Sequence, residues 1–150
     1  MGDRANVCVV MDHEGGYSGS VYFYTHWHGA ELPRLVQRAL GRRQRWDDPA
    51  YLARIIFSEM IRDDVGGETG FGISLEVQDN EYPLLVVDAR RNNMQVHILP
   101  ASREGTMPGD VPDFQDHEKY PCWSFGEFVA VTTKDLVQAW ASVPVRDVRE

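Results

Sequence analysis

Two histidines, His26 and His28, flank Trp27 at a point where a strand-like run passes into a helix-like one. If the strand continues through Trp27, both imidazoles project from the same face and could share a metal ion. Zinc needs further ligands. The candidates are Asp12, His13 or Glu14, if the hairpin folds them back, and His117 or Glu118 in a later acidic loop. The H-x-H pair is a weak signal, because no H-E-x-x-H pattern accompanies it. We therefore expect no cofactor, with zinc or another divalent metal at His26, His28 and His117 as the alternative.

His26 is also the candidate centre of a hydrolase. It could act as a general base together with Asp12 and His13, which lie in the turn-rich stretch before the second strand. A hairpin would place that stretch at the opposite end of the strand from His26, which argues against a shared site. We keep His26, Asp12 and His13 as the candidate catalytic residues of a small hydrolase, with or without a metal.

The two cysteines are the candidate nucleophiles. Cys8 lies in the apolar run VCVV and is expected to pack as a small hydrophobic residue, although strand pairing could bring it to His26 as a thiol–imidazole dyad. Cys122 is expected to be better exposed and is near His117. A reactive thiolate needs an electropositive, partly exposed setting, and no nucleophile elbow, P-loop or dinucleotide fingerprint occurs. The sequence thus leans away from an enzyme.

Aromatic and basic side chains suggest a binding surface instead. Tyr22, Tyr24 and Trp27 share the second strand, and Arg34 and Arg38 lie on the helix that follows. Tyrosine and tryptophan dominate the energetics of protein interfaces, so an exposed aromatic strand face would suit a protein partner. The competing and favoured interpretation is a core strand covered on both faces. These five residues are the candidate binding residues.

Composition and charge narrow the possible partners. The net charge of −8 argues against binding to nucleic acid, which needs a surplus of cations. No apolar run approaches the roughly 18 residues that a membrane helix requires. The start, MGDRANVCVV, lacks the apolar region of a signal peptide, and the two cysteines form no C-x-x-C pair. We therefore expect a cytoplasmic protein that binds neither nucleic acid nor a membrane.

The first half of the chain predicts two strands and then two helices. Residues 5–11 and 20–27 are rich in apolar and β-branched side chains and are separated by a Gly-Gly turn, which is typical of a hairpin. From residue 31 to 40, apolar residues recur with helical spacing. A second helical stripe follows from 49 to 60, after an aspartate that can cap the helix and a proline in its first turn.

The second half predicts four strands and a helix. The run at 71–77 alternates, and its apolar residues are expected to face inward. Further strands are predicted at 84–88, 94–99 and 127–131, so that the strands from residue 71 to 99 form a meander. Thr132 is then expected to cap a last helix.

These elements predict an α+β domain. The predicted order is β-β-α-α-β-β-β-β-α, with an antiparallel sheet of five or six strands and two or three helices packed on one face. No linker or repeat divides residues 1–150, so we expect a single domain. Residues 100–121 are expected to form a long acidic, proline-rich loop, and residues 144–150 a frayed tail.

Several segments together resemble a known group of proteins. They are the opening MGDRANV, YTHW with the LP that follows it, RWDDPAYLARIIFSEM, ETGFGIS and DNEYPLLVVD. Over roughly residues 1–90 the chain resembles a family of small proteins from bacteria and their phages. In that family a glycine stands where this chain has His28, which weakens the metal hypothesis and leaves His26 as the more interesting histidine. The resemblance implies a cytoplasmic protein of bacterial or phage origin and brings no activity with it.

The favoured hypothesis is therefore a small acidic protein-binding module, such as a phage-borne or host-defence-related inhibitor or adaptor. The alternative is the small hydrolase centred on His26. An acidic mimic of nucleic acid is a third option, which would require carboxylates along one face at the spacing of phosphates.

Overall fold

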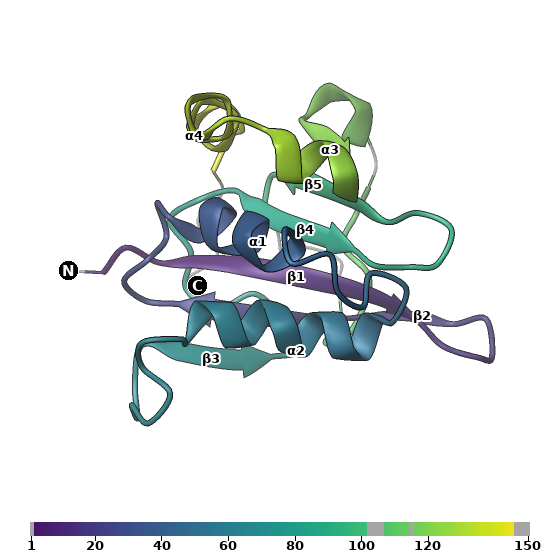
Figure 1. Ribbon diagram of the computed structural model, residues 1–150, viewed down its shortest axis with the longest axis horizontal. Helices are drawn as coiled ribbons and strands as arrows, with labels where there is room; N and C mark the ends of the chain where they lie inside the picture. The colour runs from purple at the N-terminus through teal and green to yellow at the C-terminus, as the bar shows by residue number, and fades with distance from the viewer. Residues whose placement is uncertain (1, 102–106, 115, 146–150) are drawn as a thin grey trace.

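A six-stranded sheet with the order β3-β2-β1-β4-β5-β6 forms the centre of the protein (Figure 1). The structure is a computed structural model that describes residues 2–101, 107–114 and 116–145. Its strands are β1 (Ala5–Asp12), β2 (Ser18–Thr25), β3 (Phe71–Ser74), β4 (Leu84–Asp88), β5 (Gln95–Leu99) and β6 (Cys122–Ser124). Its helices are α1 (Leu32–Leu40), α2 (Pro49–Met60), α3 (Phe125–Ala130) and α4 (Thr133–Ser142), with a short 3₁₀ turn, η1 (His117–Lys119). The α+β prediction is confirmed.

The sheet is mixed, which corrects the prediction of a wholly antiparallel one. β1 and β2 form the expected antiparallel hairpin, in which Ala5 pairs with Thr25 and Asp12 with Ser18. However, β4 lies parallel to β1, with Val7 opposite Leu85. The chain leaves β3 at one edge, crosses the sheet and enters β4 on the other side of the hairpin. A parallel pair needs such a crossover, and no local sequence signal indicates one, so the expected meander is wrong.

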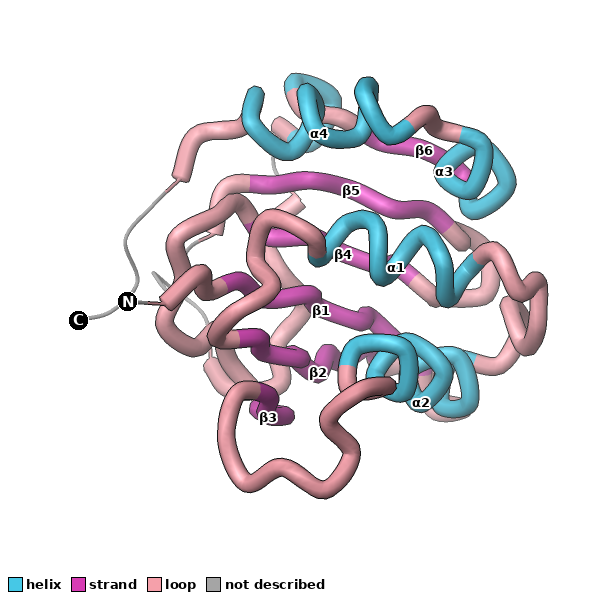
Figure 2. Tube along the Cα trace, turned by 60° about the vertical axis from the view of Figure 1, so that its left-hand side comes forward, coloured by secondary structure: helices cyan, strands magenta, loops and turns pink. Residues whose placement is uncertain are grey.

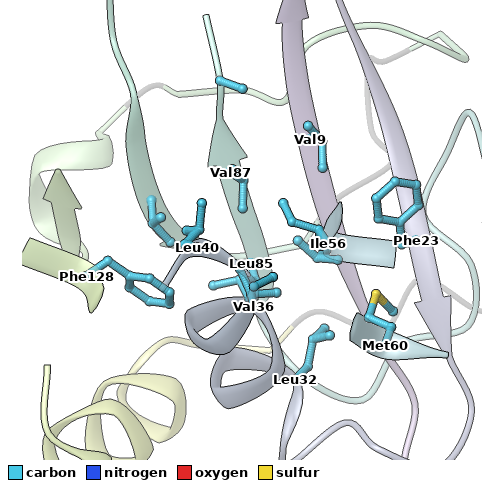
Figure 3. Packing of buried hydrophobic residues seen from close by; sticks show 14 of the residues in the cluster. Val9, Phe23, Leu32, Val36, Leu40, Ile56, Met60, Leu85, Val87 and Phe128 are labelled. Atoms are coloured by element: carbon cyan, nitrogen blue, oxygen red, sulfur yellow. The ribbon is translucent and has the colours of Figure 1, made fainter. Parts of the chain in front are cut away.

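All four helices lie on one face of the sheet, as Figure 2 shows. Val9, Phe23 and Val87 of the strands point into the core, where they meet buried side chains of α1 and α2 such as Val36 and Ile56 (Figure 3). The apolar stripes of α1 and α2 form because residues three and four apart lie on one side of a helix. This layer is the larger of the two cores.

The other face of the sheet is covered by loops. Its buried cluster includes Cys8, Val10 and Tyr22 of the hairpin, and Val111 and Phe114 pack against it. Both residues belong to the acidic loop predicted at 100–121, of which residues 102–106 and 115 lie outside the described part. The described part of this loop therefore contributes to the stability of the fold, because it shields apolar strand residues from water.

Two local predictions are corrected by the structure. The predicted strand at 127–131 is helix α3, which begins with a capping box between Ser124 and Glu127, and the last strand is instead β6. The alternating run at 71–77 is a strand only up to Ser74. Ile73 and Leu75 are exposed rather than inward-facing, because β3 lies at the edge of the sheet.

The ends of the described chain add two observations. Of the predicted frayed tail at 144–150, residues 146–150 lie outside the described part. Within the described residues, no helix combines the length and the apolar character that crossing a membrane would take.

Candidate functional site

The turn from β2 to α1 spans residues 26–31 and is held in place by Asp3. The backbone N–H of Asp3 donates to the carbonyl of His26 at 2.7 Å, and the Asp3 carbonyl accepts the N–H of Gly29 at 2.7 Å. The carboxylate of Asp3 also accepts the N–H of Ala30 at 3.0 Å. Several backbone polar groups of this turn are thus paired within the protein, which fixes its shape.

The stacked rings of Tyr82 and Trp140 pack against the same turn at Gly29. A Cβ atom at Gly29 would lie 2.5 Å from the ring of Tyr82. That ring stacks on Trp140 with 5.5 Å between centroids, and the Trp140 indole N–H donates to the Gly29 carbonyl at 3.0 Å. The Tyr82 hydroxyl donates to the Asp3 carboxylate; burial, then this bond, raises the pKa of Tyr82 to about 12. Three segments that are distant in the sequence therefore meet here: the start of the chain, the end of β2 with the turn after it, and residues 79–83.

Trp27 leaves the turn on the helical side of the sheet and remains 47% exposed. Its ring packs over Gly70, whose φ is +98° and where a Cβ atom would lie 2.2 Å from the indole. His26 beside it is tied to the fold, because its N–H donates to the Gly70 carbonyl at 2.8 Å. The His26 ring lies with Nδ1 2.9 Å from the hydroxyl oxygen of Tyr24. The segment around His26 and Trp27 is therefore, as predicted, the end of a strand that leads into a helix.

The three candidate metal ligands do not come together. His28 stacks on Phe71 with 5.8 Å between centroids, and its Nδ1 lies 3.6 Å from a Glu31 carboxylate oxygen. His117 instead packs near β5, which is three strand positions from β2, or about 14 Å at the usual spacing. Among the described residues, no three His, Cys, Asp or Glu side chains are placed to hold a metal ion. No described geometry thus supports the metal alternative at His26, His28 and His117.

The candidate catalytic residues are also apart. Asp12 ends β1 opposite Ser18, whereas His26 follows Thr25, which pairs with Ala5. Seven strand steps separate the two ends of this hairpin, or about 23 Å at 3.3 Å per residue. Asp12 instead accepts the backbone N–H of Arg91 at 3.1 Å, and His13 lies in the hairpin turn. The hydrolase hypothesis centred on His26 gains no partner from the described residues.

The candidate binding residues divide between the two faces of the sheet. Tyr22 is buried under the loops beside Cys8, and Tyr24 is on the same side, half-buried. Arg34 turns away toward α4, where it donates to the Thr133 hydroxyl at 2.9 Å. Only Trp27 and Arg38 share a site.

That site is a groove of about 710 Å³ between the β2–α1 turn, α1 and the end of α2. Apolar side chains of Trp27, Leu35, Met60 and Phe71 line part of it. The volume lies within the range of about 300 to 1,000 Å³ that is usual for ligand sites. We refer to it below as the Trp27 groove.

Glu59 forms the charged wall of the groove, and the sequence analysis did not single it out. Its carboxylate is buried and accepts from Arg42 at 2.7 Å and from Arg62 at 3.2 Å, while Arg38 lies 3.5 Å away. Burial by itself would raise the pKa of Glu59, but the hydrogen bonds from Arg42 and Arg62 hold this pKa below its ordinary value. One carboxylate thus fixes three guanidinium groups and leaves two positive charges in excess. A sequence signal existed, because Glu59 falls on the buried stripe of α2, three residues after Ile56.

The rim of the groove carries acids that are not used in this way. Glu31, Asp63 and Asp64 line it. Within the described residues, neither Asp63 nor Asp64 has an ion pair. The lining of the groove holds four carboxylates, those of Glu59 and the three rim acids, against the guanidinium groups of Arg38 and Arg62, so its formal charge is negative.

A second cluster, on the loop-covered face, pairs Cys122 with His97. The two residues are neighbours across β5 and β6, and the Cys122 sulfur lies 3.8 Å from His97 Nε2. His97 is buried, and its Nδ1 has no partner in the described residues. Burial lowers the pKa of His97 and raises the pKa of Cys122, which favours a neutral thiol beside a neutral imidazole. This pair lacks the electropositive setting of a reactive thiolate, and Cys8, whose pKa is raised to about 12 by burial, is less reactive still.

Comparison with known proteins does not add a function. The chain matches no protein-family model, and neither the curated proteins nor the solved structures contain one that is significantly similar to it.

Proposed function

We propose that the protein is a small acidic protein-binding module, an inhibitor or adaptor, whose Trp27 groove receives a basic segment of a partner protein. The observation that carries the proposal is a half-exposed tryptophan in a groove lined by apolar side chains and by two carboxylates, Asp63 and Asp64, that have no ion pair within the described residues. Exposed tryptophans are frequent centres of binding energy in protein interfaces. Few side chains other than Trp27 combine exposure, size and a neighbouring groove in this structure.

The charge of the groove argues for a basic partner segment. Asp63, Asp64 and Glu31 would attract arginine or lysine side chains, and the face of the Trp27 indole would attract their cationic groups. The net charge of −8 adds a longer-range attraction that speeds encounter with a cationic partner. An arginine beside a leucine or similar residue would use both the rim and the apolar floor.

A defined peptide tests this proposal. The probe is an amidated hexapeptide of alternating arginine and leucine, and the readout is calorimetric titration. We expect saturable one-to-one binding that is weakened about tenfold or more by Trp27→Ala, and by the double change Asp63→Asn and Asp64→Asn. A hexapeptide of alternating glutamate and leucine should not bind.

The matched control removes two negative charges from the other face. Asp116→Asn with Glu118→Gln makes the same change in net charge, at exposed positions outside the groove. This variant should keep its affinity for the arginine peptide within about twofold. If both double variants lose affinity equally, binding reflects net charge alone and the groove is not the site. Circular dichroism of each variant establishes that the fold is intact.

A further inference from the structure

A second pocket, separate from the Trp27 groove, lies on the outer flank of α2. It encloses about 480 Å³. One wall consists of Tyr51, Arg54 and Ser58 of α2, and the other of Arg42 and Arg45 in the turn after α1. The helical residues recur at positions i, i+3 and i+7, so their side chains share one side of α2. We call this the arginine pocket.

The arginine pocket presents hydrogen-bond donors and no carboxylate among its lining residues. The donors are three guanidinium groups, two hydroxyls and the side-chain amide of Gln44. Guanidinium groups are always protonated, and their planar N–H forks match the oxygens of phosphate. The rest of this region is basic as well: residues 34–62 contain seven arginines against three acids, in a protein whose net charge is −8. Three of these seven arginines line the pocket.

Two of the three guanidinium groups are already held in position. Arg42 is fixed by its 2.7 Å bond to the buried Glu59, whose single charge is shared among three arginines. The guanidinium of Arg45 lies 4.5 Å from the centre of the Tyr51 ring, and its link to Asp48 is long, at 3.9 Å. Arg54 has no ion pair within the described residues. An anion would therefore find ordered donors and little competition from carboxylates, which reduces the entropy lost on binding.

The backbone of this turn is consistent with such a role. Arg43 and Arg45 both have left-handed φ angles, of 55° and 57°. Non-glycine residues adopt this conformation at a cost, and such strain gathers at sites where a side chain must be aimed. The guanidinium of Arg43 lies over the ring of Trp46, 5.1 Å from its centre. Arg43 is therefore not among the residues that line the pocket, whereas Arg42 and Arg45 are.

We infer that the arginine pocket binds a small phosphate monoester, with the phosphate on Arg42, Arg45 and Arg54 and the ester group against Tyr51 and Ile55. The volume exceeds what a phosphate ion alone would fill and falls in the range of about 300 to 1,000 Å³ of small-molecule sites. Tyr51 is 48% exposed and offers a ring face at the rim. The site uses different residues from the Trp27 groove and does not depend on the function proposed for that groove.

Phenyl phosphate and inorganic phosphate are the probes, at constant ionic strength, with calorimetric titration as the readout. We expect saturable binding of both, with phenyl phosphate the tighter. Arg54→Gln should weaken phenyl phosphate binding about tenfold or more. Arg34→Gln is the matched control, because Arg34 is an exposed arginine on α1 that contacts Thr133 instead; this change should alter the affinity less than twofold.

Three outcomes would overturn the inference. The first is an equal loss in the Arg54 and Arg34 variants, which would mean attraction by net charge only. The second is an absence of saturable binding to the folded wild-type protein. The third is a phosphoserine peptide that binds clearly tighter than phenyl phosphate, because this would assign the pocket to a modified protein rather than to a small ester. Tyr51→Phe separates the hydroxyl from the ring: it should leave most of the preference for phenyl phosphate intact.

Discussion

At the scale of single residues, Gly70 decides where Trp27 lies. Its φ of +98° is unfavourable for any residue with a side chain, and a Cβ atom there would overlap the Trp27 ring. We predict that Gly70→Ala lowers the free energy of unfolding by about 2 kcal/mol and moves the indole out of the groove. Urea unfolding measures the first effect, and the loss of arginine-peptide binding measures the second.

Gly66→Ala provides the comparison for that prediction. Gly66 lies in the same loop, has no left-handed φ, and a Cβ atom there would have nothing within 4 Å. Its stability should change by no more than about 0.5 kcal/mol. If Gly70→Ala is equally harmless, the placement of Trp27 does not depend on the glycine.

Glu59 gives a prediction that depends on pH. Its folded pKa is below the ordinary value of 4.5, so its ionised form stabilises the fold above that value, and the stabilisation is lost as pH falls through the folded pKa. We predict that Glu59→Gln lowers the unfolding free energy by about 2 kcal/mol at pH 7, since charge-assisted hydrogen bonds to a buried group are lost. Because protonated Glu59 resembles glutamine, the gap between the two proteins should shrink below pH 4.5.

The measurement is urea unfolding at pH 7, 5, 4 and 3. Glu31→Gln is a control, because this exposed carboxylate lines the same groove and should contribute less than about 0.5 kcal/mol at any of these pH values. A gap between wild type and Glu59→Gln that stays constant down to pH 3 would contradict the role of the charge.

Residue types alone predicted part of the candidate site. Trp27 and Arg38 were expected on chemical grounds, and they do share the groove. Glu59 was missed because a glutamate within a helix is usually solvated, and only packing shows three arginines around it. His97 was missed for another reason: its neighbour Cys122 comes from a strand register between β5 and β6, and register is a tertiary property.

At the scale of elements, periodicity predicted helices well and short strands poorly. The stripes of α1 and α2 are long enough to be distinctive, whereas the five apolar-rich residues at 127–131 fit a strand or a helix equally. A cue was present in the spacing of Ser124 and Glu127, which form the capping box of α3. The crossover from β3 to β4 left no local cue, because its route over the sheet is fixed by long-range packing.

The loop after β5 is acidic and proline-rich in sequence, yet two of its apolar residues cover a buried cluster of the sheet. Phe114 packs against the cluster that buries Cys8, with its ring centre 5.1 Å from that of His97. We predict that Phe114→Ala destabilises the protein by about 2 kcal/mol, less than the roughly 3 to 5 kcal/mol of a fully buried phenylalanine. It should also increase the rate at which Cys8 reacts with a thiol reagent, since the loop shields it.

The control for that prediction lies in the same loop. Met107 is exposed, so Met107→Ala should change neither stability nor Cys8 reactivity measurably. Cys122 is exposed and would react as well, so the reaction of Cys8 is followed in a Cys122→Ser background for all three proteins. Unchanged protection of Cys8 in Phe114→Ala would mean that the loop is not the shield.

At the scale of the whole molecule, arginines are concentrated in the helical layer, although the Trp27 groove in the same layer is lined by acids. The helical layer carries seven arginines within residues 34–62, while the opposite face is covered by a loop with several acids, among them Asp110, Asp113 and Asp116. The formal net charge therefore hides two surfaces of different character. The net charge argues against binding to a nucleic-acid duplex, but it does not reveal this distribution, which depends on how the helices gather on one face of the sheet.

The two proposed sites are connected through one carboxylate, which yields a last prediction. Glu59 holds Arg38 and Arg62 at the Trp27 groove and Arg42 at the arginine pocket. A cationic peptide in the first site and a phosphate ester in the second attract one another. Two unit charges 4 Å apart in water gain only about 1 kcal/mol, so over the larger distance between the sites the coupling should be under about fivefold.

We predict that phenyl phosphate tightens arginine-peptide binding by this modest factor, that the peptide tightens phenyl phosphate binding equally, and that 0.5 M salt abolishes the effect. Titration of each ligand with and without saturating amounts of the other measures both arms. Weaker binding of each in the presence of the other would contradict this coupling by charge.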